Sequence, residues 1–419
     1  MKKIKKMITG LCACTMLTVA AAGCSGPGEN KETTQATTTM AGDADPALKN
    51  KMTDTISVFG VQLFKNALNL EEDDGKNVLI SPYSVYMALG MTANGASGES
   101  HSQMEEVLGM KIDDINKVLS QNPGSISGSG NALKSANSIW INKRDGFTVK
   151  NEFKELTETV YGAAAEELPF NDAAKEKINS WVRKNTDNMI DSVINRINSD
   201  AMMYLINALA FDAKWEEPYK KEDLAETEFT GEDGIKEAVS LMHSREGIYF
   251  KDDKAEGFKK YYENGDYSFL AIKPLEGVNV KDYVNDLSAE YIKKLMGEDE
   301  GLIEARIVYA AIPKFMSDYE TELSGSLYQM GMSAPFAGGF DGISEDKDLR
   351  INEVIHKTHI DVFEEGTKAG AVTSVGLQVT GVYEENRVEV YLDRPFIYMI
   401  IDENEHIPIF TGCVMHIGQ

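Results

Sequence analysis

A run of small and acidic residues near the C-terminus constrains the fold more than any other segment. Residues 364–373 read Glu-Glu-Gly-Thr-Lys-Ala-Gly-Ala-Val-Thr. These side chains are too small to build a core, yet they suit a β-strand better than a plain linker. With the two-residue period of a strand, one face carries Thr367, Ala369, Ala371, Thr373 and Val375. A face this small can slide over a packed core, so the segment indicates a loop that later becomes a strand inside an existing sheet.

The N-terminus has the features of a targeting segment rather than of folded structure. Lysines at positions 2, 3, 5 and 6 precede an apolar stretch, Met7 to Ala22, that is too short and interrupted for a membrane span. It ends in Ala21-Ala22-Gly23-Cys24, which resembles a bacterial lipobox, where small residues precede a cysteine that receives lipid. An ordinary signal peptide with an incidental cysteine is the alternative. We predict a lipoprotein signal peptide over residues 1–23 and a multi-chain lipid anchor on Cys24.

The composition beyond the signal peptide predicts a tether followed by one domain. Residues 24–46 are rich in Gly, Thr, Glu, Asp and Ala and have almost no large apolar side chains. We therefore expect a disordered tether there. We find no internal repeat and no second linker in residues 47–419, so we expect one large domain.

Charge and cysteine content restrict the partners and the chemistry. Acidic residues outnumber basic ones by 67 to 42, and the formal net charge is −25. This balance argues against nucleic acid as a partner and favours attraction to basic partners, although a solvated acidic surface explains it most simply. Of the four cysteines, Cys12 and Cys14 lie in the signal peptide and Cys24 is the lipid site. Cys413 is then left alone, so we expect no intramolecular disulfide and a buried strand position for Cys413.

Hydrophobic periodicity predicts helices mainly in the N-terminal half and strands in the C-terminal half. Helices are expected over 54–68, from Pro82 to near Gly95 with Ser81 as N-cap, over 98–108 and over 178–193. Apolar runs predict strands over 78–80, 203–211, 267–275, 305–315, 360–363, 388–392, 396–401 and 407–414. This distribution indicates an α+β fold with large antiparallel or mixed sheets.

Separated blocks of residues between positions 77 and 412 resemble, in the same order, the pattern of the serpin family of protease inhibitors. The blocks are Asn77 with Ser81-Pro82-Tyr83-Ser84, Ala136-Asn137, Ile178-Asn179 with Trp181-Val182, Asn207-Ala208 through Phe211 to Trp215, Ile312-Pro313-Lys314-Phe315, Phe340-Asp341-Gly342-Ile343, His356-Lys357, residues 364–373, Asp393-Arg394-Pro395-Phe396 and Gly412. The resemblance implies helices packed around three β-sheets, with an exposed mobile reactive loop.

The resemblance also implies roles for particular residues. The hinge, at the start of the reactive loop, would include Glu364, Gly366, Thr367, Ala369, Gly370 and Ala371. The region where the central sheet opens would include Ser81, Ser84, Asn207 and His356, and insertion would begin at Trp215. For His356, a structural and a functional interpretation lead to the same role, because supporting the sheet is itself the function that the resemblance implies. A metal site at His356 and His359 is not expected, because strand positions three apart point to opposite faces.

The mechanism implied by the resemblance is suicide inhibition of a serine protease. The protease cuts the loop and forms an acyl-enzyme with it, and the freed hinge inserts as a new strand. Such a protein is not an enzyme and needs no cofactor or metal. We expect a monomer, bound to the membrane only through its lipid, at the extracellular face of the cell envelope. A non-inhibitory surface-binding serpin and an inhibitor of cysteine proteases are the alternatives; Thr367 is small where non-inhibitory relatives often carry a charge.

The scissile bond has two candidate positions. The family's usual spacing counted from Glu364 gives Thr380-Gly381, whereas counting back from Pro395 gives Glu384-Glu385. We prefer the first, because the inserted length sets how far the protease is carried. The alternatives to this bond involve Val382, Tyr383, Glu384 and Glu385.

The loop composition predicts the class of target protease. Residues 369–386 contain no Lys or Arg, so the buried carboxylate of a trypsin-like pocket would stay unpaired. Small residues around Thr380 favour an elastase-like target. Tyr383 leaves a chymotrypsin-like alternative, and Glu384 a glutamate-specific one.

Overall fold

Two hydrogen-bonded β-sheets and the helices around them form the part of the chain that the computed structural model describes. That part comprises residues 45–71, 75–121, 132–144, 147–298, 303–367 and 388–418. The predicted signal peptide, Cys24 and nearly all of the tether lie outside the described residues. So do Ala369, Gly370, Ala371 and both candidate scissile bonds. Within the described ranges, no helix is long and apolar enough to span a membrane.

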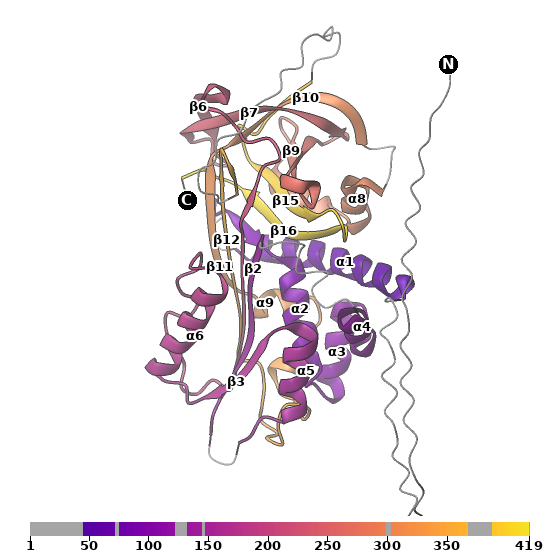
Figure 1. Cartoon of the computed structure of the whole chain (residues 1–419), viewed down its shortest axis with the longest axis vertical. Helices are drawn as coiled ribbons and strands as arrows, with labels where there is room; N and C mark the ends of the chain where they lie inside the picture. Colours follow the sequence, from indigo (N-terminus) through magenta and orange to yellow (C-terminus); the bar gives the residue numbers. More distant parts are fainter. Residues whose placement is uncertain are drawn as a thin grey trace, which may run out of the picture. The chain divides into compact units, whose positions relative to one another are not determined.

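The helices lie mostly in the first half of the domain (Figure 1). They are α1 (Pro46–Leu70), α2 (Pro82–Ala93), α3 (Gly98–Leu108), α4 (Ile112–Gln121), α5 (Asn151–Tyr161), α6 (Asp172–Asn185), α7 (Val280–Asp286), α8 (Ala289–Lys293) and α9 (Ser324–Gln329). The first helix begins earlier than the apolar spacing predicts, because the Asp45 side chain accepts a hydrogen bond from the Ala47 amide (3.0 Å) and Pro46 fits the first turn. Ser81 caps α2 as predicted, accepting from the Ser84 amide at 3.2 Å.

The strands of the described residues are distributed over the two sheets. They are β1 (Val78–Ile80), β2 (Leu133–Asn142), β3 (Ala164–Leu168), β4 (Met203–Phe211), β5 (Ala213–Lys214), β6 (Leu224–Thr230), β7 (Lys236–Lys251), β8 (Ala255–Tyr261), β9 (Tyr267–Pro274), β10 (Ile303–Pro313), β11 (Phe315–Glu322), β12 (Glu353–Phe363), β13 (Gly366–Thr367), β14 (Val388–Tyr391), β15 (Phe396–Asp402) and β16 (Ile407–Val414). The strand predicted over 305–315 is divided at Lys314, and β10 and β11 belong to different sheets. The predicted α+β class is confirmed.

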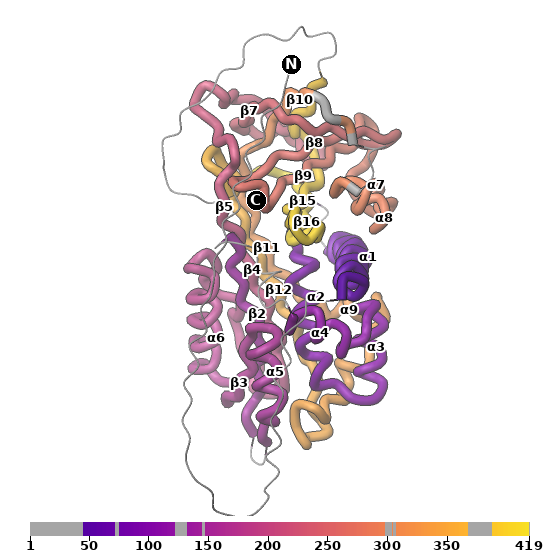
Figure 2. The backbone as a smooth tube through the Cα atoms, turned by 45° about the vertical axis from the view of Figure 1, so that its right-hand side comes forward, coloured from indigo at the N-terminus to yellow at the C-terminus, as the bar shows by residue number. Residues whose placement is uncertain are grey.

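The seven-stranded sheet, called the central sheet below, has the order β3-β2-β4-β12-β13-β5, with β11 beside β12. Helix α6 packs on one of its faces, where Ile178 and Val182 share a core with Ile206 and Ala208 of β4. Leu205 and other alternate residues of β4 point to the opposite face and join the main core with α2. Figure 2 shows α6 and α2 on opposite sides of these strands. Every residue of β4 is therefore buried, as its continuous apolar run predicts.

The nine-stranded sheet has the order β1-β16-β15-β9-β8-β7-β10-β14, with β6 beside β7. Three sheets are predicted, but the described strands form two. The reason is that β7 is long enough to pair with two different groups of strands and so joins them into one sheet. Its first residues pair with β6, its last residues pair with β8, and β10 runs along most of its length. Cys413 lies fully buried in β16, as expected.

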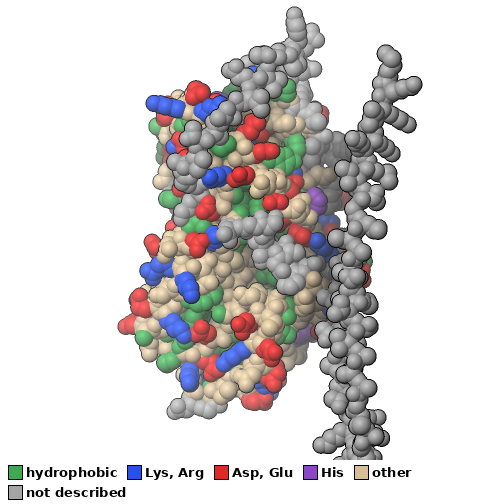
Figure 3. Space-filling model, in the orientation of Figure 1, with side chains coloured by type: hydrophobic (Ala, Val, Ile, Leu, Met, Phe, Trp, Pro, Cys, Tyr) green, Lys and Arg blue, Asp and Glu red, His purple; other side chains and the backbone are tan. Residues whose placement is uncertain are grey.

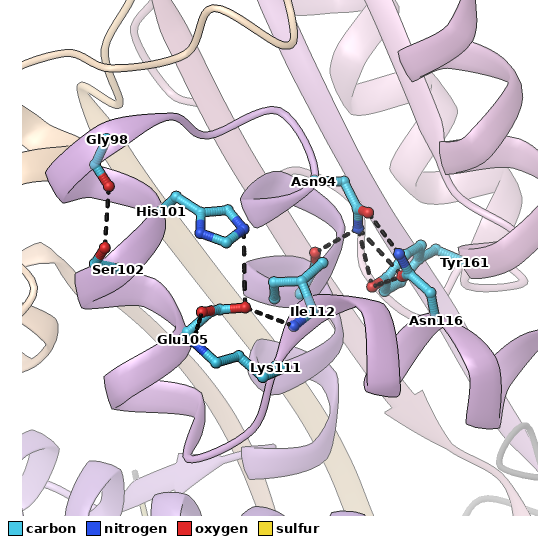
Figure 4. Close-up of polar contacts among 10 residues, drawn as sticks. Asn94, Gly98, His101, Ser102, Glu105, Lys111, Ile112, Asn116 and Tyr161 are labelled. Carbon is cyan, nitrogen blue, oxygen red and sulfur yellow. Dashed lines mark hydrogen bonds and ion pairs between the residues drawn. The ribbon is translucent and has the colours of Figure 1, made fainter.

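Polar side chains join the helices beside the central sheet (Figure 4). Asn94, which follows α2, donates to Asn116 of α4 and to the Tyr161 hydroxyl of α5 (3.3 and 3.1 Å). Glu105 of α3 pairs with Lys111 and accepts from the first amide of α4. The Asn94 contacts hold the C-terminal end of α2, whose first turn reaches the central sheet through Ser84 and Asn137. On the face drawn in Figure 3, acidic and basic side chains are intermixed, so the acidic excess there is dispersed.

Candidate functional site

The first residues of the predicted hinge form a strand at one end of the central sheet. After β12 the chain turns at Glu364 and Glu365 and returns as β13, which pairs antiparallel with the end of β12. The other edge of β13 pairs antiparallel with β5. Farther along the sheet, β12 and β4 pair directly and in parallel, over residues 353–359 and 204–210. The hinge thus enters the sheet at the end where β12 and the β4–β5 segment diverge.

Close approach of the backbone explains the glycine and the small residue in β13. A Cβ on Gly366 would lie 2.2 Å from the carbonyl oxygen of Ala213, so a side chain there would push β13 away from β5. Thr367 is completely buried, and its Oγ1 lies 2.8 Å from the Tyr262 hydroxyl. Burial raises the pKa of Tyr262 well above its ordinary value, so this hydroxyl keeps its proton. The predicted inward face of the hinge therefore begins at a closed and fully paired position.

Residues 215–219, called the support segment below, hold the turn that precedes β13. The Trp215 amide donates to the Glu365 carbonyl (3.0 Å), and its indole Nε1 donates to the Phe363 carbonyl (2.9 Å). The Tyr219 amide donates to the Glu364 carbonyl at 2.8 Å. Three consecutive carbonyls are thus satisfied by one short segment. Trp215, which the resemblance assigns to the start of insertion, thus lies directly beside the turn that precedes β13.

The side chains around this end of the sheet are large and tightly packed. The rings of Trp215 and Tyr262 stack at 4.3 Å, and Phe211 packs edge-on against Tyr262 at 5.0 Å. On the outside of the turn, Glu364 forms an ion pair with Lys314 (2.8 Å). Desolvation opposes ionisation of Glu364, but the hydrogen bond from Lys314 lowers its pKa overall. The hinge entrance therefore has a rigid aromatic interior and a charged exterior.

The predicted opening region forms one polar network in the middle of the central sheet. The ring of His356 on β12 bonds through Nδ1 to the Asn207 Oδ1 on β4 and accepts from the Ser81 amide through Nε2 (3.0 Å). Since Nε2 accepts, Nδ1 carries the proton. Asn207 in turn donates to Ser84 and to Asn137 of β2. The structure thus brings together Ser81, Ser84, Asn207 and His356, and it adds Asn137.

Burial fixes the charge state of this network. His356 is completely buried, and desolvation lowers its pKa to about 3. The imidazole is therefore neutral at physiological pH, and its two nitrogens make the two bonds described above. This side-chain bond between β12 and β4 crosses the pair of strands that must separate if another strand is to enter between them.

Sequence reasoning assigned no role to two residues of the site, Tyr262 and Asn137. Tyr262 lies in an ordinary-looking run, Lys259-Lys260-Tyr261-Tyr262, without a local signal for its role. Asn137 belongs to the block Ala136-Asn137 of the family pattern, and this match was the available sequence signal for it. In the described ranges, no group of His, Cys, Asp and Glu side chains could hold a metal ion.

Comparisons with known proteins identify the family and the fold. The family model described as "Serpin (serine protease inhibitor)" matches residues 54–417. An uncharacterized serpin-like protein of Thermococcus kodakarensis is 29% identical, covering 96% of this chain and 97% of its own length. The native state of the thermophilic serpin tengpin is 37% identical, with a TM-score of 0.80 over 87% of this chain and 94% of that one. Its latent state gives 36% identity and a TM-score of 0.74, over 88% and 98%. The predicted family resemblance and fold are confirmed.

Proposed function

Because the chain belongs to the serpin family, whose members are generally protease inhibitors, we propose that it inhibits serine proteases by loop cleavage and strand insertion. The target attacks the reactive loop, which begins with the hinge at Glu364, and forms an acyl-enzyme. The freed hinge then extends β13 into the central sheet and carries the protease with it before water can release it. The product is a covalent complex between one inhibitor and one protease.

The observation that carries the proposal is the position of Gly366 and Thr367 between β12 and β5. A strand that continues from them toward His356 would lie between β12 and β4. It would replace one parallel ladder by two antiparallel ladders, because β13 is antiparallel to both of its neighbours. Antiparallel pairing is slightly more stable per residue, and the number of ladders doubles. Insertion is therefore favourable once the loop is cut, and the uncut state is kept by a kinetic barrier.

The small size of Thr367 favours inhibition over simple cleavage. Inhibition is a race between insertion and deacylation, so each inward residue must enter the core without a cost. Thr367 already does so and pairs with Tyr262. A surface-binding serpin that never inserts its loop has no need of this fit.

For the target, we propose an elastase-like serine protease that cuts at Thr380-Gly381. The loop offers no Lys or Arg between residues 369 and 386, and small residues flank this bond. Trypsin-like enzymes are expected to be inhibited negligibly.

The proposed location is the outer face of the cell envelope, with the domain attached through lipid on Cys24 and the tether. The described part of the chain begins at Asp45, the N-cap of α1, where the predicted tether ends. Cys24→Ser should move the protein from the membrane fraction to the soluble fraction, because the tether has no apolar surface of its own. A mutant that stays in the membrane fraction after signal cleavage would require another anchor.

The test of the function is a mixing experiment with elastase-like, chymotrypsin-like, trypsin-like and papain-like proteases. We expect a complex with the elastase-like enzyme that survives denaturing electrophoresis, and mass spectrometry of the released C-terminal peptide should locate the cut between residues 379 and 384. Loop cleavage without any complex would support the non-inhibitory alternative. A complex formed only with the papain-like enzyme would support the cysteine-protease alternative.

A further inference from the structure

A buried ion pair lies directly against the support segment. Lys260 of β8 and Glu246 of β7 meet at 3.1 Å, with side chains only 3% and 11% exposed. The Lys260 ammonium also donates to the Glu217 carbonyl at 3.2 Å. Burying a lysine is expensive unless the charge is paired and its protons are used, and both conditions are met here.

The same ammonium lies over two aromatic rings of the support segment. Its Nζ is 5.5 Å from the Trp215 ring centroid and 4.6 Å from that of Tyr219. Both distances fall within the range of cation–π attraction. Lys260 therefore touches the first, third and fifth residues of the support segment, and Trp215 and Tyr219 are the two residues that donate hydrogen bonds to the turn before β13.

The support segment depends on such contacts because β5 has little support from the sheet. Within the described residues, β5 comprises two residues and its ladder partner is β13 itself. Beyond β5, Trp215 forms a single bridge to Tyr262. A longer strand would be held by ladders on both sides. The segment after β5 is held instead by this bridge, by single backbone hydrogen bonds such as that from the Glu216 amide to the Tyr261 carbonyl (3.1 Å), and by side-chain contacts such as those of Lys260.

We propose that Lys260 is a positioning residue for strand insertion, an inference that rests on the proposed function. It fixes the support segment, so that β5 and the turn at Glu364 and Glu365 form a rigid starting point for pairing of the new strand. Glu246 holds the ammonium in place, and Ser244 links Glu246 to the Tyr219 hydroxyl (2.6 and 3.4 Å). Removing the charge at position 260 frees the segment and slows the start of insertion.

The adjacent residue provides a matched control. Lys259 on the same strand forms an equally buried ion pair with Glu403 at 2.9 Å, with side chains 2% and 15% exposed. Its other contacts are with the Met296 carbonyl and the Tyr261 ring, on the opposite face of β8. Lys259→Met breaks a comparable pair without touching the support segment.

The experiment measures the rate of insertion after the loop is cut, in the full mature protein. Fluorescence of Trp215, one of three tryptophans, follows the change, and the gain in thermal stability of the cut form measures its completion. Lys260→Met should slow insertion about tenfold, because it removes both cation–π contacts and the hydrogen bond to the Glu217 carbonyl. It should also raise the number of inhibitor molecules consumed per protease. Lys260→Arg should recover most of the rate, and Lys259→Met should keep the wild-type rate although it lowers native stability.

Equal slowing by the two methionine variants, or no slowing by Lys260→Met, would overturn the inference while leaving the proposed function intact. If Lys260→Met does not fold, the double variant Lys260→Met/Glu246→Gln removes both charges and is compared in the same way. A wild-type protein that gains no stability when its loop is cut would overturn the proposed function, and this inference with it.

Discussion

The boundary between the paired strands β4 and β12, called the seam below, is held by different kinds of contact in its middle and at its end. In the middle, hydrogen bonds join His356, Asn207 and Ser81 across the two strands and the start of α2. At the end, the stacked rings of Trp215 and Tyr262 and the Lys260 ammonium lie around the entering hinge. The first region is held by directional hydrogen bonds between individual polar groups, whereas the second is held by the close packing of rigid rings.

From this difference we expect one part of the seam to move and the other to stay fixed. A hydrogen-bond network can exchange partners when strands separate, provided that each buried group finds a new one. Packed aromatic rings cannot shift without opening cavities, so they remain as a fixed platform. Opening is therefore expected to begin beside the fixed end, where β13 already separates the strands, and to proceed into the polar middle.

The largest effect is expected at the fixed end, from Thr367→Arg. Thr367 is completely buried against Tyr262, so a guanidinium there would be unpaired and β13 would leave the sheet. Covalent complex formation should fall by at least about 100-fold, because an unpaired buried charge costs several kcal/mol. The rest of the fold should persist, as circular dichroism would check. Thr367→Ser, which keeps the hydroxyl, serves as the control. Complexes formed in full yield by the arginine variant would contradict insertion at this hinge.

The next largest effect is a pH dependence that arises in the polar middle. The folded pKa of His356 is about 3, below the unfolded value of about 6.5. Between these values the unfolded chain binds a proton that the folded chain does not. Stability from this group is therefore complete above pH 6.5 and decreases by up to about 1.4 kcal/mol per pH unit as the pH falls toward 3.

Other groups titrate in the same pH range, so the contribution of His356 must be measured as the difference in stability between wild type and a variant. Burial raises the pKa of Asp402 to about 6, and its contribution has the opposite sign, since stability from it grows as the pH falls. Denaturant unfolding of wild type and His356→Gln at several pH values isolates the histidine. The two curves should converge as the pH falls from 6.5. Parallel curves would show that His356 is protonated in the folded protein.

A smaller effect is expected from Asn137→Ala, which removes one acceptor from the polar middle. The Asn207 amide and the Ser84 hydroxyl would each lose a partner, at a cost of about 1–3 kcal/mol. The seam should open more often, so the variant should lose inhibitory capacity faster on storage. Asn142→Ala is the control, because Asn142 ends the same strand and bonds to Ser199 and Ala201 instead. Equal loss of capacity in both variants would remove the special role of the middle.

The smallest effect is expected from Glu364→Gln on the exterior of the fixed end. The ion pair with Lys314 is partly exposed, so its loss should change the free energy of unfolding by less than about 1 kcal/mol. The carbonyl of residue 364 still accepts from Tyr219, so the rate of insertion should remain close to that of wild type. Salt should reduce the small difference in stability. A large loss of inhibition would mean that the ion pair, rather than the support segment, holds the hinge.

Local signals in the sequence determined much of the fold. Ser81 and Pro82 mark the start of α2 because capping and proline geometry act within one turn. The apolar run of β4 and the C-terminal strands is visible because burial on both faces requires it. The small residues after Glu364 predict a hinge for the same kind of reason, since a strand that must enter a core needs small inward side chains.

Tertiary structure alone decided the two-residue strands and the polar partners. β5 and β13 are too short to have a period, so only their neighbours define them. Lys260 looks in sequence like half of a solvated lysine pair. It is buried because Glu246 on β7, the Glu217 carbonyl and two aromatic rings converge on one point. The sequence itself determined where the chain must be small, capped or apolar. The groups that satisfy a buried charge were decided by the packing of β7, β8 and the support segment, because such contacts join residues that have no fixed spacing along the chain.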